Sequence, residues 1–437
     1  MTATASFDAI IAAGKALERG SLDLLGRLIG ATREGRQAID AIIEHAMQSA
    51  RCAVERFDYD PKAVPLVDEF AASPVVSGTT ETCLVARLAG RGEGRSLLLF
   101  AHPDPEIPED THGWRNDPFQ PTLENGRLFG WGVADDLAGI AMLIQCVQLL
   151  HGVGCRLRGD LVLVAAPSKK HRRGIAAALH RGIAADAAVY LHPAESGRGL
   201  DEIKAYAPGQ LEFAITVEGR EPETAEPAHT AFAHRAVNPF DKAMLIASAL
   251  KVVGEDRGRR FCHPTIETAI GRSTNLMLTH CDFGSAGKLS RISPSCRLGG
   301  AMTLVPGECL EDVMAAVDQA VCAVAGRDDW LRDHPPAIDW LSGVSAAETD
   351  ETSDLYQLVA GILRETGASP RVNPLHTSSD IRNPIVQGGM PTIGFGPLCG
   401  GLTMAGGNDE WVDVADYHRA IVATALIITQ WCGVIEL

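Results

Sequence analysis

The chain has 437 residues, of which 46% are hydrophobic and 22% charged, and its formal net charge is −16. This length exceeds what one hydrophobic core usually organises, so we expect two domains. The negative charge argues against nucleic-acid binding, because phosphates would be repelled. No apolar run approaches the roughly 18 to 20 residues of a membrane span, so we do not expect the chain to be a membrane protein.

The N-terminal stretch and the cysteines indicate a cellular compartment. Residues 1–20 form an alanine-rich amphipathic pattern without the basic, apolar and small-residue order of a signal peptide. Eleven cysteines occur, and no Cys-x-x-Cys pair is among them, which argues against a disulfide framework or a cysteine-based zinc site. The sequence therefore predicts a cytoplasmic chain.

Strands and helices alternate along most of the chain. The apolar runs at 96–101, 161–164, 187–191 and 392–395 are typical of buried strands. Apolar residues spaced between 140 and 150 mark one face of a helix, and Asp135 or Asp136 is placed to cap it. This alternation predicts an α/β domain with a mainly parallel sheet.

Polar side chains follow three of these strands directly. His102 ends the first, residues 168–170 follow the second and His192 follows the third. The carboxyl ends of parallel strands share one edge of a sheet, where ligands gather. The sequence thus predicts a functional site at this edge, independently of any family.

The pattern changes after residue 208. Residues 211–217 alternate like a half-exposed strand, a helix runs through 241–246, and glycine-rich strands lead to a helix over 310–324. This predicts an inserted α+β domain over 208–326. The α/β domain would then consist of 1–207 and 327–437.

Three motifs carry a family resemblance. They are His102-Pro103-Asp104, the segment Trp-Arg-Asn-Asp-Pro-Phe at 114–119, and the segment from 126 to 135 that ends in Ala-Asp. Their order and spacing resemble the zinc metallopeptidase and deacylase family that includes acetylornithine deacetylase, succinyl-diaminopimelate desuccinylase, aminoacylase and the glutamate carboxypeptidases. The similarity continues to 408–412. It implies a catalytic α/β domain interrupted by a lid domain, and a homodimer formed through that lid.

The resemblance also implies a metal site. In this family two zinc ions share a bridging aspartate, which would be Asp135 here. His102 and His192 would complete one site, although the family usually has a carboxylate at the latter position, and Asp104 would orient His102. Hydrogen-bonded histidines and a capping aspartate remain alternatives, and two histidines with one carboxylate can also hold iron. We expect one divalent metal, zinc.

The second metal site is altered. Lys169 and Lys170 stand where the family has two adjacent glutamates, the general base and a ligand, and Gly406 stands where it has a histidine. An ammonium cannot coordinate a metal, and a charged lysine cannot accept a proton. The sequence predicts that this metal is lost, or that the Lys170 ammonium beside Asp135 replaces it. The basic run at 169–173 is otherwise a solvated helix end.

Further residues resemble substrate contacts. His229 matches a lid histidine that helps to hold the transition state, with His234 as a competitor, and Asn238 matches a lid asparagine that is otherwise a helix cap. Arg382 is a candidate carboxylate clamp, because a guanidinium pairs bidentately with carboxylates. A salt bridge on the surface is the alternative for Arg382. We also assign Lys170 to substrate binding.

Three functions remain open. The first is hydrolysis of an amide bond in an N-acyl amino acid or dipeptide-like molecule, through one metal or an altered site in which a deprotonated Lys169 is the base. The second is an inactive relative that binds a small ligand or a partner in the same cleft. The third is a repurposed enzyme in which Lys169 and Lys170 bind an anionic group at the helix that begins near Gly174.

Overall fold

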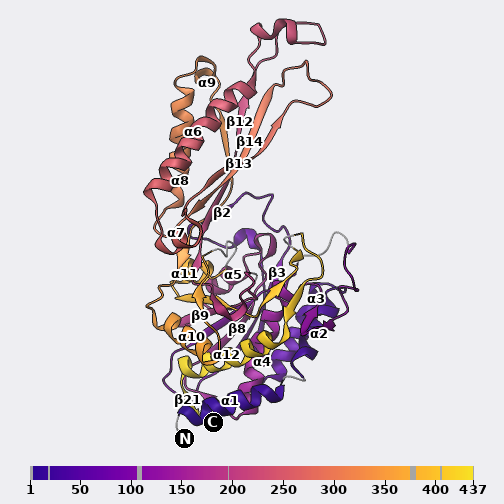
Figure 1. Ribbon diagram of the computed structural model, residues 1–437, viewed down its shortest axis with the longest axis vertical. Coiled ribbons are helices and arrows are strands. Elements are labelled where there is room, and N and C mark those ends of the chain that lie inside the picture. Colours follow the sequence, from indigo (N-terminus) through magenta and orange to yellow (C-terminus); the bar gives the residue numbers. More distant parts are fainter. Residues whose placement is uncertain are drawn as a thin grey trace. The chain divides into compact units, whose positions relative to one another are not determined.

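The computed structural model describes residues 3–17, 20–105, 111–194, 196–374, 380–403 and 406–436 (Figure 1). The chain divides into two compact units. Unit 1 contains Met1–Leu66, Pro74–Ala207 and Glu348–Leu437, and unit 2 contains Val67–Ser73 and Pro208–Ala347. Unit 2 is thus inserted into unit 1, and each unit is described by itself below.

The predicted end of the inserted domain at 326 is wrong. Unit 2 begins at Pro208 but continues to Ala347. Strand β15 (Ala337–Val344) pairs antiparallel with β12 (Gly209–Glu218), and β2 (Glu69–Ala71) pairs with the other edge of β15. Because β15 completes the sheet of unit 2, the residues between 327 and 347 belong to that unit.

Unit 1 is built on a six-stranded sheet in the order β1-β3-β8-β4-β9-β18. Its neighbours β8, β4, β9 and β18 are parallel, whereas β1 pairs antiparallel with β3 and β3 with β8. All four predicted strands are present, and the mainly parallel core is confirmed. The strands are β1 (Ala53–Tyr59), β3 (Glu81–Leu88), β4 (Leu97–Ala101), β8 (Leu161–Ala165), β9 (Ala187–Leu191) and β18 (Thr392–Phe395).

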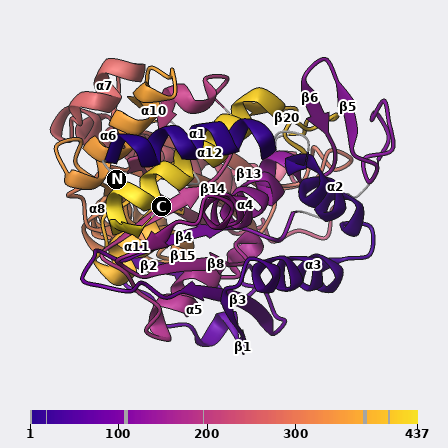
Figure 2. The same ribbon diagram turned by 90° about the horizontal axis from the view of Figure 1, so that it is seen from below.

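Both faces of this sheet are covered, which explains the continuous apolar runs. Leu97 and Leu99 of β4 pack into a core shared with α4 (Ala138–Gly152) and α12 (Val414–Cys432). Leu98 and Phe100 pack on the other side with α5 (Gly174–His180). Figure 2 shows α4 and α12 on one side of the strands and α5 on the other.

The remaining elements of unit 1 surround this layered core. The other helices are α1 (Ala3–Leu17), α2 (Ser21–Ala31), α3 (Arg36–Ser49), α10 (Asp354–Glu365) and α11 (Arg382–Gly388). The short strands are β5 (Thr122–Glu124), β6 (Arg127–Phe129), β7 (Arg156–Leu157), β10 (Glu202–Ile203), β11 (Tyr206–Ala207), β16 (Ala347–Glu348), β17 (Arg371–Val372), β19 (Cys399–Gly400), β20 (Trp411–Asp413) and β21 (Val434–Glu436).

One helical stretch departs from the expectation that no run resembles a membrane span. Val133–Gly152 is long and apolar enough to cross a membrane by length and composition. However, 94% of its most apolar window is buried inside the fold. It is hydrophobic on all sides because it lies in the core between the sheet and its neighbouring helices, as a buried helix of a globular domain does.

Unit 2 is an α+β sandwich of one sheet and two long helices. The sheet order is β13-β14-β12-β15-β2, with β13 (Leu276–Phe283) at one edge and β14 (Ser295–Leu304) beside it. The helices are α6 (Pro239–Arg260), α7 (Pro264–Ile270), α8 (Leu310–Ala325) and α9 (Asp329–Asp333). Met244 on α6 and Met277 on β13 are exposed. The pairing of two copies through this domain stays a prediction.

Candidate functional site

The two lysines lie in a strained turn that follows β8. Lys170, His171 and Arg173 all have left-handed backbone, with φ of 54°, 52° and 57°. Such conformations are unfavourable for residues other than glycine and persist only where the surroundings hold them. One such contact is the Tyr59 hydroxyl, which donates a 2.6 Å hydrogen bond to the carbonyl of Arg172.

Asp104 is the main support of this turn. Its carboxylate accepts hydrogen bonds from the backbone N–H groups of Ser168 and Lys169, both at 3.0 Å, and from Arg172 Nη1 at 2.9 Å. The predicted role of Asp104 in orienting His102 is therefore wrong, because both carboxylate oxygens are used by the turn. Asp104 instead fixes the backbone from which the Lys169 side chain extends.

Lys169, and not Lys170, supplies the positive charge beside Asp135. The Lys169 ammonium forms an ion pair with Asp135 Oδ2, and the two side chains are only 16% and 8% exposed. Burial alone would lower the pKa of Lys169, but the charge of Asp135 and its hydrogen bond raise that pKa above its ordinary value. Lys169 therefore stays charged, which contradicts its predicted role as a deprotonated base. The Lys170 side chain is exposed.

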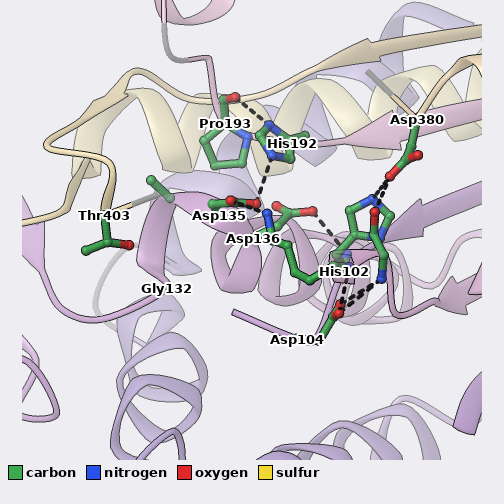
Figure 3. Close-up of polar contacts among 12 residues, drawn as sticks. His102, Asp104, Gly132, Asp135, Asp136, His192, Pro193, Asp380 and Thr403 are labelled. Carbon is green, nitrogen blue, oxygen red and sulfur yellow. Dashed lines mark hydrogen bonds and ion pairs between the residues drawn. The ribbon is translucent and has the colours of Figure 1, made fainter. Parts of the chain in front are cut away.

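His192 approaches the same carboxylate from the end of β9. Its Nδ1 lies 2.8 Å from the carbonyl oxygen of Pro193, which can only accept, so Nδ1 carries the proton. The Nε2 atom then faces Asp135 Oδ1 at 3.4 Å (Figure 3). Burial alone would raise the pKa of Asp135, but His192 and Lys169 hold it below its ordinary value. Asp135 is therefore an ionised carboxylate between the Lys169 ammonium and the Nε2 atom of His192.

His102 belongs to a second ion pair. Its Nδ1 lies 2.6 Å from the Ala166 carbonyl oxygen, and its Nε2 lies 2.6 Å from Asp380 Oδ2, which Figure 3 shows directed at the ring. Ser168 Oγ donates to the same Asp380 oxygen at 2.6 Å. Burial alone would lower the pKa of His102, but Asp380 raises it to about 9. His102 is thus an imidazolium at neutral pH.

Two further buried carboxyl groups, Asp136 and Glu410, accept hydrogen bonds from the backbone of the site. Asp136 accepts a 3.0 Å hydrogen bond from the backbone N–H of His102, and Glu410 accepts from the N–H groups of Ala134 and Asp135 at 2.7 and 3.1 Å. Burial raises the pKa of Asp136 to about 7, and burial with the charge of Asp135 raises that of Glu410 to about 7.

The expectation that Asp135 or Asp136 caps the following helix is wrong. Both lie in a π-type turn over Val133–Leu137, with non-helical backbone at each aspartate, and α4 begins at Ala138 with no side-chain cap. The turn instead directs Asp136 at the backbone of His102 and Asp135 at Lys169. These two carboxylates are thus used by the site and not by the helix.

The predicted metal set is not assembled in this arrangement. Within the described ranges, no group of three His, Cys, Asp or Glu side chains is placed to hold a metal ion. Both oxygens of Asp135 are engaged by Lys169 and His192, and His102 faces Asp380 instead. A metal ion at Asp135 would stand beside a charged ammonium, and like charges repel. The residues present therefore do not fit zinc at His102, Asp135 and His192.

The predicted lid residues all lie in unit 2. His229 is buried, and its Nδ1 accepts a 3.2 Å hydrogen bond from the backbone N–H of Ile292, whereas His234 is exposed. Asn238 caps α6 by accepting from the Phe240 N–H at 3.2 Å. The cap that was an alternative for Asn238 is thus present. The substrate contacts of His229 and Asn238 stay predictions.

Arg382 is placed as a candidate anion contact in unit 1. It opens α11, and its charge contributes to lowering the pKa of Asp380, after the larger effect of His102. Its Nε and Nη1 atoms are buried and have no hydrogen-bond partner in the part of the chain that the structure describes. Buried guanidinium donors are costly to leave unpaired, so Arg382 has capacity to bind a ligand.

Gly406 has a backbone conformation that suits glycine. Its φ is +77°, and a Cβ added there would meet nothing within 4 Å. A side chain at 406 would therefore have space but would strain the backbone. This fits the absence of a ligand-bearing residue at 406. Restoring histidine there would require the loop to change.

Several contacts of the site were not predicted from the sequence. They involve Ser168, Asp380 and Glu410, and also Asp136, which was predicted only as a helix cap. A charged residue within an apolar segment is the sequence feature that could have indicated these contacts, because a buried carboxylate requires a partner. The identity of each partner depends on tertiary contacts between distant segments.

Comparisons with known proteins agree with this fold. The profile of "Peptidase family M20/M25/M40" matches residues 98–430. The chain is 28% identical to a succinyl-diaminopimelate desuccinylase of Methylobacterium radiotolerans over 397 residues, covering 89% of this chain and 90% of the relative. It is 25% identical to an N-formyl-4-amino-5-aminomethyl-2-methylpyrimidine deformylase of Halalkalibacterium halodurans over 354 residues, covering 77% and 79%.

A solved structure is similar across the whole length. The fold matches a Bacillus subtilis protein described as a dinuclear metal binding peptidase, with a TM-score of 0.62 and 13% identity over 96% of this chain and 100% of the other. At this identity the likeness shows the fold alone. The family profile covers well over half of the chain and includes the strand ends at which the site lies. This chain is a member of the peptidase family M20/M25/M40.

Proposed function

We propose that the chain hydrolyses an amide bond in a small N-acyl amino acid or dipeptide-like molecule, with the Lys169 ammonium in place of a metal ion at Asp135. The observation that supports this is the buried Lys169–Asp135 ion pair at the carboxyl edge of the sheet. The names of the relatives describe removal of a succinyl and a formyl group. Substrates of the same class are the first to test.

Lys169 and Asp135 each have a role in this proposal. The Lys169 ammonium would donate a hydrogen bond to the carbonyl oxygen of the substrate amide. There it would stabilise the negative charge that develops in the transition state. Asp135 is the ionised acceptor beside it, and its lowered pKa makes it a weak base. Since a well-matched general base contributes about 100-fold to 10,000-fold, we expect slow turnover.

A second function is binding of an anionic small molecule without turnover. It is favoured by the unpartnered guanidinium atoms of Arg382 in the described part of the chain and by the lasting charge of Lys169. The predicted cytoplasmic location and the predicted small-molecule partner are part of both proposals. The two functions differ in whether a bound ligand is cleaved.

The experiment is a screen of N-acyl amino acids and dipeptides with purified chain, in the presence of a chelator and of added zinc. Hydrolysis that is equal under both conditions and lost in Asp135→Asn supports the first function. A ligand that raises thermal stability but is never cleaved supports the second. Turnover that requires zinc contradicts the assignment of Lys169 as the cation of the site.

We expect Arg382→Gln to weaken binding of substrates or ligands that carry a carboxylate. The loss of a charged hydrogen bond is typically about 1.5–3 kcal/mol, so KM should rise on the order of tenfold to 100-fold with little change in kcat. The matched control is the same compound with a carboxamide in place of the carboxylate. Equal losses for the acid and the amide would contradict the role of Arg382.

A further inference from the structure

Lys204 is a fully buried lysine that the proposed chemistry does not use. Its Nζ donates 2.8 Å hydrogen bonds to the carbonyl oxygens of His192 and Pro193, which are consecutive and follow β9 directly. Nothing in the sequence pattern marks this residue. Its ammonium thus contacts the backbone of the segment that carries a site histidine.

The position of Lys204 is fixed by its backbone. Lys204 and Gly394 exchange two hydrogen bonds of 2.7 Å, and Gly394 lies in β18 beside β9. A Cβ at Gly394 would lie 3.3 Å from Cβ and Cδ of Lys204. The absence of a side chain at 394 therefore lets the lysine stem lie against the strand and reach the end of β9.

One carbonyl connects Lys204 to the site. The Pro193 oxygen accepts from Lys204 Nζ and from His192 Nδ1, each at 2.8 Å. This oxygen therefore keeps a proton on His192 Nδ1 and leaves Nε2 facing Asp135. A ring held by its second nitrogen in this way is fixed in orientation.

Burying this ammonium is unfavourable unless it is paired. Glu202, also fully buried, places Oε1 3.9 Å from Lys204 Nζ, and Asn373 Nδ2 donates to the other carboxylate oxygen at 3.2 Å. An apolar side chain of similar volume would often be as stable at such a position. A purely structural role thus gives little reason for a lysine at 204.

We propose that Lys204 is a positioning residue, whose ammonium holds the Pro193 carbonyl and thereby fixes the His192 ring against Asp135. The proposal concerns the geometry of His192. It rests on the proposed function only where activity is the readout. Its test therefore needs a signal that exists whether or not the chain turns over a substrate.

The test is NMR of ¹⁵N-labelled histidine side chains in the full chain, with the His192 signals assigned from His192→Asn. We expect the wild type to show one set of His192 signals with Nδ1 protonated, and folded Lys204→Met to show changed His192 signals with unchanged His102 signals. Gln145→Leu is the matched control, because Gln145 is equally buried but contacts Tyr417 and Ser21 instead. This control should leave His192 unchanged.

If Lys204→Met does not fold, Lys204→Gln takes its place, since a neutral and shorter side chain cannot reach both carbonyls. Unchanged His192 signals in a folded variant of either kind would overturn the proposal. If the wild type hydrolyses a substrate, kcat should also fall, on the order of 100-fold for a misplaced group, and KM should change little. A wild type without turnover would remove the proposed function and leave the NMR result to decide on Lys204.

Discussion

Replacing Lys169 by methionine should destabilise unit 1 by about 3 kcal/mol. The change removes one partner of a buried ion pair and leaves Asp135 charged, and breaking such pairs typically costs about 3–5 kcal/mol. The lower end applies because His192 still faces Asp135. Urea unfolding, followed by hydrogen exchange of peptides that cover β4 and β8, measures the stability of this unit.

A double-mutant cycle separates the pair from the rest of the fold. Asp135→Asn in the Lys169→Met background should recover part of the loss, because neither charge is then left unpaired. The neighbouring Lys170→Met is the matched control. Its side chain is exposed, so its effect should stay within about 0.5 kcal/mol. Strictly additive effects of Lys169→Met and Asp135→Asn would contradict the ion pair.

His102 should contribute a loss of roughly 1.5 kcal/mol to the stability of unit 1 as the pH rises from about 7.5 to about 9. The pKa of His102 is raised in the folded chain from an ordinary value of 6.5 to about 9. A raised histidine pKa contributes stability that is fully present below the unfolded value and is lost as the pH rises through the folded one. The loss reflects the pair between His102 and Asp380.

The His102→Gln variant separates this pair from the other groups that titrate. Burial raises the pKa values of Cys52, Cys83 and Cys146 above 9.0, so these thiols add a loss of stability of their own as the pH approaches 9. Asp136 and Glu410, with pKa values near 7, destabilise the fold mainly as the pH rises toward 7. Urea unfolding should show the loss above pH 7.5 in the wild type and in the control His45→Gln, whose histidine is exposed. In His102→Gln the loss should be smaller by roughly 1.5 kcal/mol. A His102→Gln variant that keeps the full loss would refute the pair.

Much of the fold followed from the sequence because its determinants are local. The runs at β4, β8 and β9 are continuous and apolar since both faces of the sheet are covered. The parallel order then placed His102 and His192 at one edge. The end of unit 2 was misplaced because β15 pairs with β12, more than 100 residues earlier, and no local signal records that pairing.

The contacts within the site could not be derived in the same way. Which lysine meets Asp135 depends on three left-handed residues in the turn after β8, and this conformation is imposed by Asp104 and Tyr59. His102 pairs with Asp380, which lies 278 residues away in the sequence. His102 lies in a sequence motif, but Asp380 was not singled out from the sequence. Their pairing arises only when the segments between them are folded.

In the proposed function the Lys169 ammonium is the cation at Asp135. The most direct measurement is the zinc content of the purified wild-type chain after equilibration with zinc and removal of the excess, by plasma mass spectrometry. We predict far less than one zinc per chain, with no difference between the wild type and Asp135→Asn. About one zinc per wild-type chain that Asp135→Asn loses would contradict the claim.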